Sequence, residues 1–144
     1  MKRFLSGALA LLFCISLMSS VAFASGADET RIDYSDGSYA IITTNVSFTR
    51  STIEHDKTYS YYNSSQKKCF SYTLYGSFTY NGIRSSADSC YAYASRYDRN
   101  WELDSHDEYT SGNTAYGEAV FSGPGGASRT VSLTLTCDKN GNVT

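Results

Sequence analysis

Apolar and polar residues alternate along several stretches of this chain, and this alternation constrains its fold more than any other feature. In residues 130–137, Val131, Leu133, Leu135 and Cys137 alternate with hydroxyl-bearing residues. Successive side chains of a β-strand point to opposite faces of a sheet, so a period of two indicates strands with one buried face. No stretch has the apolar spacing of an amphipathic helix. The same alternation recurs strongly in residues 39–48 and 70–80, and more weakly in 58–62, 90–97 and 114–122.

The interior of such a protein is expected to be aromatic. Residues 25–144 contain thirteen tyrosines, four phenylalanines and one tryptophan, but only thirteen isoleucine, leucine and valine residues together. Aromatic side chains suit a pleated, half-buried surface, although each buried tyrosine hydroxyl needs a partner or a place at the edge of the core. We therefore expect Tyr91 and Tyr93 inside. We also expect one buried face made of Phe70, Tyr72, Leu74, Phe78 and Tyr80.

Turn residues separate the alternating runs. Asn81-Gly82 is a favoured two-residue hairpin turn, which would pair Tyr80 with Ile83, and glycine-rich segments surround Gly112 and Pro124. Six to eight short strands with such punctuation predict an antiparallel β-sandwich, with a small β-barrel as the alternative. The order Cys90, Trp101, Cys137 resembles that of immunoglobulin domains. Leu135 replaces their corner tyrosine and only seven residues follow Cys137, so immunoglobulin-like architecture is expected without strict immunoglobulin topology. Residues 25–35 look like a frayed lead-in.

The N-terminus has the pattern of an export signal. Lys2 and Arg3 precede an apolar run over residues 4–18, and Ala22 and Ala24 provide the small residues that signal peptidase requires. We expect residues 1–24 to be removed and residues 25–144 to form one secreted, extracellular all-β domain. The apolar run is too short to remain as a membrane span, so no membrane association is expected after cleavage.

The charge balance excludes one class of partner. Without Lys2 and Arg3, ten basic residues stand against fourteen acidic ones, a net charge of −4. Nucleic-acid-binding domains are usually basic, so no nucleic-acid partner is expected. The possible partners that remain are a surface glycan or a protein.

Three cysteines remain after the signal, and one disulfide is the default for an exported protein. With Tyr80 opposite Ile83, Cys69 and Cys90 would lie about 13 Å apart along the hairpin. A disulfide requires Cα atoms within about 7 Å. We therefore expect Cys137 to bond either Cys69 or Cys90, and the sequence does not decide between them.

The richest polar cluster is the acidic segment 102–108. Asp104, His106 and Asp107 are candidate metal ligands. Their spacing fits neither an EF-hand nor a zinc-protease helix, and alternation places Trp101 and Leu103 inward with Glu102 and Asp104 in solvent. A solvated loop or strand is the preferred interpretation, so no metal and no cofactor are expected.

No catalytic residue is expected either. Residues 133–137 read Leu-Thr-Leu-Thr-Cys, which differs from the sortase motif in its first two residues and lacks the downstream arginine. Exposed aromatic rings that line a binding surface are the remaining possibility, and Tyr97 and Trp101 are the candidates for it.

The C-terminal third resembles small secreted proteins of Gram-positive bacteria of the Firmicutes. The resemblance rests on Ser111-Gly112-Asn113-Thr114-Ala115-Tyr116-Gly117, on residues 131–137 and on the following Asp138-Lys139-Asn140-Gly141-Asn142. It implies an exported bacterial domain and brings no activity or site residue with it. The sequence thus favours a non-catalytic binding module at the cell surface. The alternatives are a bacteriocin-like or toxin-type antagonistic factor, and a hydrolase or metal-binding protein.

Overall fold

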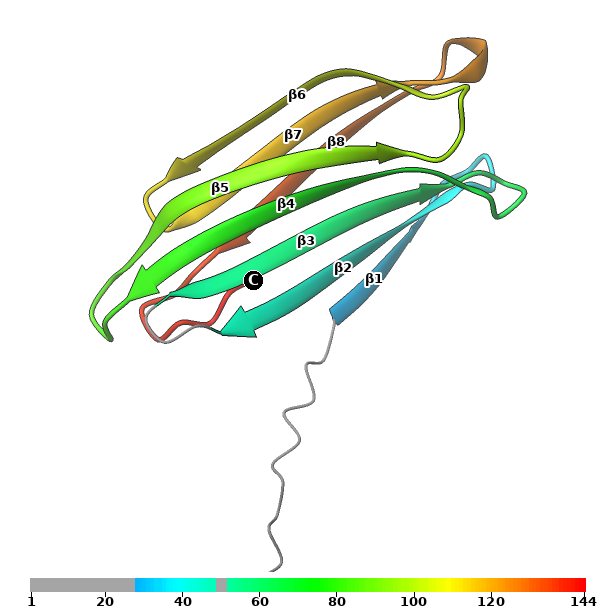
Figure 1. Cartoon of the computed structure of the whole chain (residues 1–144). Coiled ribbons are helices and arrows are strands. Elements are labelled where there is room, and N and C mark those ends of the chain that lie inside the picture. The colour runs from blue at the N-terminus through cyan, green and yellow to red at the C-terminus, as the bar shows by residue number, and fades with distance from the viewer. Residues whose placement is uncertain (1–27, 49–51) are drawn as a thin grey trace, which may run out of the picture.

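The computed structural model describes residues 28–48 and 52–144, so the expected signal in residues 1–24 lies outside the described part. Residues 124–126 form the short 3₁₀ turn η1 (Pro124–Gly126). The rest of the regular structure is β, in eight strands that follow the chain from blue to red in Figure 1: β1 (Asp28–Asp33), β2 (Tyr39–Phe48), β3 (Ile53–Tyr62), β4 (Lys68–Tyr80), β5 (Ser85–Arg96), β6 (Glu102–Ser111), β7 (Thr114–Ser122) and β8 (Ser128–Thr136).

The strands form two antiparallel sheets, each in simple sequence order. The larger sheet runs β1-β2-β3-β4-β5 and the smaller runs β6-β7-β8. Strands β3, β4 and β5 pack on β8, β7 and β6, which gives the two layers seen in Figure 1. The predicted antiparallel sandwich is confirmed. Within the described residues the sheets remain open and separate, so the alternative of a closed barrel is wrong, and the sequential strand order differs from the immunoglobulin order.

The core between the layers is aromatic, as predicted. The rings of Phe70 on β4 and Phe121 on β7 stack across the layers with centroids 3.9 Å apart. Trp101 lies 5.0 Å from both Phe70 and Tyr61, measured between ring centroids. The aliphatic contribution comes mainly from Leu74 and from three residues of β8, namely Val131, Leu133 and Leu135.

Buried tyrosine hydroxyls find partners at the limits of this core. The Tyr72 hydroxyl reaches across to the smaller sheet, where the carbonyl oxygen of Glu118 lies 3.1 Å away. Burial raises the pKa of Tyr72 to about 12. The hydroxyls of Tyr59 and Tyr34 are 2.8 Å apart and bond to each other. These bonds allow polar aromatic residues to serve as core residues.

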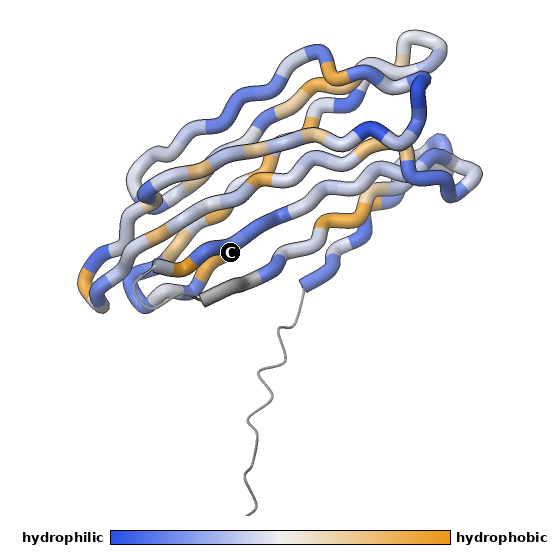
Figure 2. Tube along the Cα trace, in the orientation of Figure 1, coloured by the Kyte–Doolittle hydropathy of each residue, from blue (hydrophilic) through white to orange (hydrophobic). Residues whose placement is uncertain are grey.

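The predicted alternation of buried and more exposed positions is clearest in β7 and β8. Figure 2 shows hydrophobic and hydrophilic positions following each other along the strands. Two expectations were wrong at strand ends. Tyr80, the last residue of β4, is 44% exposed and rests against Gly141 instead of entering the core.

Residues 28–33 form the ordered edge strand β1 in place of a frayed lead-in, with all six residues exposed and paired to β2. Its charged residues suit an exposed edge.

The hairpin between β4 and β5 has a longer turn than predicted. Tyr80 pairs with Ser85, so four residues form the loop instead of two. The Asn81 side chain explains the difference, because its carboxamide oxygen accepts hydrogen bonds from the backbone N–H groups of Ile83 and Arg84. A further register shift between Ser77 and Phe78 moves Cys90 opposite Gly76.

Gly123 tests the packing of Trp101. A Cβ atom at this position would lie 2.7 Å from the indole ring, closer than real contacts allow. We expect Gly123→Ala to lower the free energy of unfolding by about 1–3 kcal/mol through overpacking. Urea denaturation followed by tryptophan fluorescence measures the change. Ser128→Ala, at the exposed start of β8, is the control and should stay within about 0.5 kcal/mol of the wild type. Equal stability of the two variants would contradict the described position of the indole.

Candidate functional site

Trp101 is a core residue and not part of a binding surface. Only 4% of it is exposed, because Tyr61 and Phe70 cover its ring on one side and Gly123 approaches it closely on the other. The suggestion that Trp101 contacts a ligand is therefore wrong. Tyr97, the other candidate, is 55% exposed and remains available.

The acidic segment forms the edge strand β6, and nearly all of its side chains are in solvent. The Asp104 carboxylate accepts a hydrogen bond from the Ser122 hydroxyl. His106 Nδ1 lies 3.3 Å from a carboxylate oxygen of Glu108. Over residues 28–48 and 52–144, no three His, Cys, Asp or Glu side chains come together as metal ligands. Leu103 is exposed, against expectation, and the register of β6 shifts between Leu103 and Ser105.

The predicted disulfide from Cys137 to Cys69 or Cys90 is not formed, and all three cysteines are free thiols. The carbonyl oxygen of Cys137 accepts a hydrogen bond from Ser85 at the start of β5. Cys90 lies five residues further along that strand, or about 17 Å. Cys69 lies beyond its far end, where its carbonyl oxygen accepts the backbone N–H of Tyr97. Burial raises the pKa of each thiol, which keeps it protonated and less reactive.

Tyr91 and Tyr93 are exposed by 57% and 46%, so the expectation that they are core residues was wrong. The other face of β5 is the inner one, and it carries small residues. Ala87 is buried there, and Cys90, Ala92 and Ala94 pack against the core. Large rings from β4 already fill the space beneath this strand, so its own tyrosines point outward.

The outward tyrosines belong to a larger surface on the outer side of the larger sheet. Strand register places side chains of β2, β3, β4 and β5 on this side in regular rows. We call this surface the tyrosine face. Its aromatic members, six of the thirteen tyrosines, are Tyr39, Tyr62, Tyr75, Tyr91, Tyr93 and Tyr97.

The rings of the tyrosine face stand upright on the sheet. Tyr75 and Tyr91, on neighbouring strands, stack at 4.6 Å with their planes 4° apart, and Tyr39 and Tyr62 stack at 4.7 Å. These distances match the spacing between strands, about 4.8 Å, so the rings of each pair face one another. Tyr97 has the Lys68 ammonium over its ring instead. The rings therefore present edges and hydroxyl groups to solvent and keep many of their faces for one another.

Hydroxyl-bearing residues form the floor between the rings. Ser60, Ser71 and Thr73 point outward yet are buried, because the surrounding tyrosines cover them. Thr73 and Thr58 share a hydrogen bond of 2.9 Å between their hydroxyls. The Tyr97 hydroxyl bonds Ser71, and this bond, with the nearby charge of Lys68, lowers the pKa of Tyr97. The face is thus a continuous surface of aromatic edges and hydroxyls on a rigid sheet.

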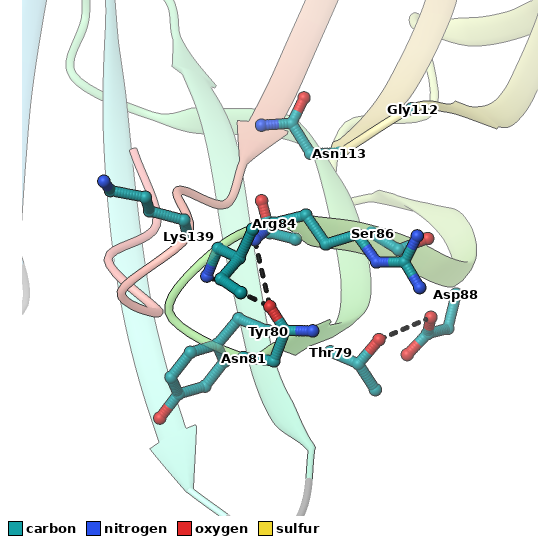
Figure 3. Close-up of a pocket in the computed structure, with 11 residues that line it drawn as sticks. Thr79, Tyr80, Asn81, Arg84, Ser86, Asp88, Gly112, Asn113 and Lys139 are labelled. Atoms are coloured by element: carbon teal, nitrogen blue, oxygen red, sulfur yellow. Dashed lines mark hydrogen bonds between the residues drawn. The ribbon is translucent and has the colours of Figure 1, made fainter.

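A second feature is a groove at the end of the sandwich where β4 meets β5. We call it the loop-end groove, and its volume is about 820 Å³ (Figure 3). The β4–β5 hairpin, the β6–β7 turn and the loop after β8 form its walls. Its lining residues are 79–81, 83–86, Asp88, Gly112, Asn113 and Lys139.

Sequence reasoning predicted only Tyr97 of the tyrosine face and missed the loop-end groove. The loop-end groove brings together residues that are far apart in the chain, and only the turn residues Asn81-Gly82 and Gly112-Asn113 marked its walls in advance. The tyrosine face follows from the choice of which side of β5 is buried. Alternation predicts that the two sides differ, but it does not decide which of them is inside.

No family model, no curated protein and no solved structure matches this chain. In the part of the chain described here, no helix is long and apolar enough to cross a membrane.

His55 on β3 is a buried group with no hydrogen-bond partner at either ring nitrogen. Burial lowers the pKa of this imidazole below its ordinary value of 6.5. Below pH 6.5 the unfolded chain binds a proton at His55 more readily than the folded chain does. The contribution of His55 to stability is therefore present above pH 6.5 and is lost as the pH falls.

We therefore expect His55→Leu to flatten the fall in the free energy of unfolding between pH 7 and pH 5. Urea denaturation at several pH values measures this slope. Ser132→Ala, at an exposed position of β8, keeps both histidines and should retain the wild-type slope. An unchanged slope in His55→Leu would show that His55 is solvated.

Proposed function

We propose that this protein is a secreted, non-catalytic binding module that acts at the surface of a bacterial cell, and that its tyrosine face binds a protein there. The main support for this function is the composition of the tyrosine face. Its combination of clustered tyrosines with serine and threonine hydroxyls, on a rigid sheet, is the chemistry of antibody paratopes. The export signal and the resemblance to secreted Firmicutes proteins support the location.

The tyrosines provide contact area at low entropic cost. A tyrosine has only two side-chain torsions, and stacking between Tyr75 and Tyr91 and between Tyr39 and Tyr62 already fixes their rings. Little conformational freedom remains to be lost on binding. A hydrogen bond from Tyr75 to Tyr93, and burial, raise the pKa of Tyr75, so its hydroxyl is held in place against its neighbour.

The orientation of the rings favours a protein over a glycan as the partner of this face. A sugar ring stacks on an exposed aromatic face, whereas most rings here face one another across the strands. Their free edges and hydroxyls are suited to the mixed polar and apolar surface of a folded protein. A surface of tyrosine, serine and threonine side chains can bind a protein without any catalytic residue.

The test uses residues 25–144, fluorescently labelled, on intact cells of the organism that produces the protein. We expect saturable binding in flow cytometry that disappears after the cells are treated with protease and persists after periodate oxidation of their glycans. The double variant Tyr91→Ser/Tyr93→Ser should weaken binding at least tenfold, because tyrosine is enriched among the interface residues whose truncation costs about 2 kcal/mol or more.

Tyr109→Ser/Tyr116→Ser is the matched control. These tyrosines form a similar stack, at 4.8 Å, on the smaller sheet. The control should bind as the wild type does, and circular dichroism should show that both double variants are folded. Absence of saturable binding, equal binding of the two double variants, or loss of binding after periodate and not after protease would overturn the proposal.

A further inference from the structure

We infer that the loop-end groove is a separate binding site for acidic oligosaccharides, in which Arg84 and Lys139, whose charged groups point to opposite sides of the groove (Figure 3), each provide a position for a sugar carboxylate. This site does not depend on the tyrosine face or its partner. At about 820 Å³, the groove has the size of typical ligand pockets, roughly 300–1,000 Å³, and exceeds the needs of a single small ion. An elongated ligand of linked sugar rings fits such a groove.

The walls of the groove are fixed to one another. The backbone N–H of Gly82 donates to the Lys139 carbonyl oxygen, and that of Ala87 donates to the Gly112 carbonyl oxygen. The carbonyl oxygen of Cys137 accepts hydrogen bonds from the Ser85 hydroxyl, at 2.7 Å, and from the Asn113 amide, at 2.6 Å. Hairpin, turn and C-terminal loop are thereby held in one arrangement, and a preorganised site loses little entropy on binding.

The cations of the groove are available to a ligand. Among the described residues, neither Arg84 nor Lys139 has a salt-bridge partner, in contrast to Arg31, Lys67 and Arg129. They line a groove with a single acidic residue, Asp88, in a chain whose net charge is −2. The Arg84 guanidinium can bind a carboxylate through two parallel hydrogen bonds, and the Lys139 ammonium provides a second positive charge on the opposite side of the groove. The site therefore favours an anionic group on its ligand.

The remaining polar groups match the hydroxyls of a sugar. The Asn81 oxygen is occupied within its own turn, which leaves the NH₂ group of this side chain as a donor. The Asn113 amide is occupied by Cys137, which leaves its oxygen as an acceptor. Asp88 accepts from Thr79 (Figure 3) and is a second acceptor at the groove. Sugar hydroxyls both donate and accept, so they can use this mixture of groups.

An acidic peptide fits the groove less well than an acidic sugar. Peptide side chains are held by apolar pockets, and the only aliphatic side chain at the groove is Ile83, which is 85% exposed. Peptide backbones are commonly held by pairing with a strand edge. The groove is lined partly by the edge strand β5, but there the backbone N–H of Ala87 already donates to the Gly112 carbonyl oxygen, and most lining side chains carry amide, hydroxyl or charged groups.

The test is a chemical-shift titration of ¹⁵N-labelled residues 25–144 by NMR. The acidic probes are trigalacturonate and sialyllactose, and galactotriose and lactose are their neutral counterparts. We expect the acidic sugars to shift the amides of residues 81–86, 112–113 and 139 with a dissociation constant in the millimolar range or tighter. The neutral sugars should bind at least tenfold more weakly, and added salt should weaken the acidic complexes.

The double variant Arg84→Gln/Lys139→Gln should abolish these shifts. Its matched control, Arg99→Gln, removes an exposed cation between β5 and β6 and should bind as the wild type does. Tyr91→Ser/Tyr93→Ser should also bind the sugars normally, which separates this inference from the proposed function. The inference is overturned if neither acidic sugar shifts these amides, if neutral sugars bind equally well, or if the double variant binds as the wild type does.

Discussion

The stacking of Phe70 on Phe121 across the two sheets is the contact on which the rest of the structure depends. Their ring centroids are only 3.9 Å apart, and Trp101 packs beside Phe70. Large side chains of β4 fit against small residues of β7. The position of a Cβ atom at Gly117 lies 3.1–3.3 Å from Leu74 and Tyr72. Because β4 fills the interior, the β5 residues that pack against the core are alanine and cysteine, and the tyrosines of β5 turn outward. The aromatic core and the tyrosine face are thus two results of one packing arrangement.

The predictable part of this fold is the part fixed by local pattern. The period-two alternation in residues 70–80 and 130–137 correctly predicted strands, the two-layer architecture and, except at Tyr80, the buried faces. Alternation does not decide which side of a strand is buried. For Tyr91 and Tyr93 on β5, this depends on the size of the side chains that β4 places in the core. The cysteine prediction was wrong for a related reason. The general tendency of exported proteins to form disulfides does not depend on where the cysteines lie in the fold. The register of β5 places Cys69, Cys90 and Cys137 far apart along the sandwich.

The two proposed binding surfaces differ in their physical basis. The tyrosine face is built from side chains that one sheet holds in rows, so its shape depends on strand register and ring stacking. The loop-end groove is built from three separate loops and the adjoining ends of β4 and β5. Its shape depends on the hydrogen bonds that Cys137 and Lys139 accept through their carbonyl oxygens. Neither surface involves the acidic strand β6, which the sequence marked as the richest polar cluster. The local density of polar residues in the sequence therefore did not indicate where the two proposed binding surfaces lie, because both are formed by residues that the fold brings together.

The most direct measurement of the aromatic packing between the sheets is a nuclear Overhauser experiment on the ring protons of residues 25–144. The structure predicts strong cross-peaks between the rings of Phe70 and Phe121, and between Trp101 and both Phe70 and Tyr61. If these cross-peaks are absent from a folded sample whose tryptophan is accessible to a soluble quencher, the two sheets do not pack as described.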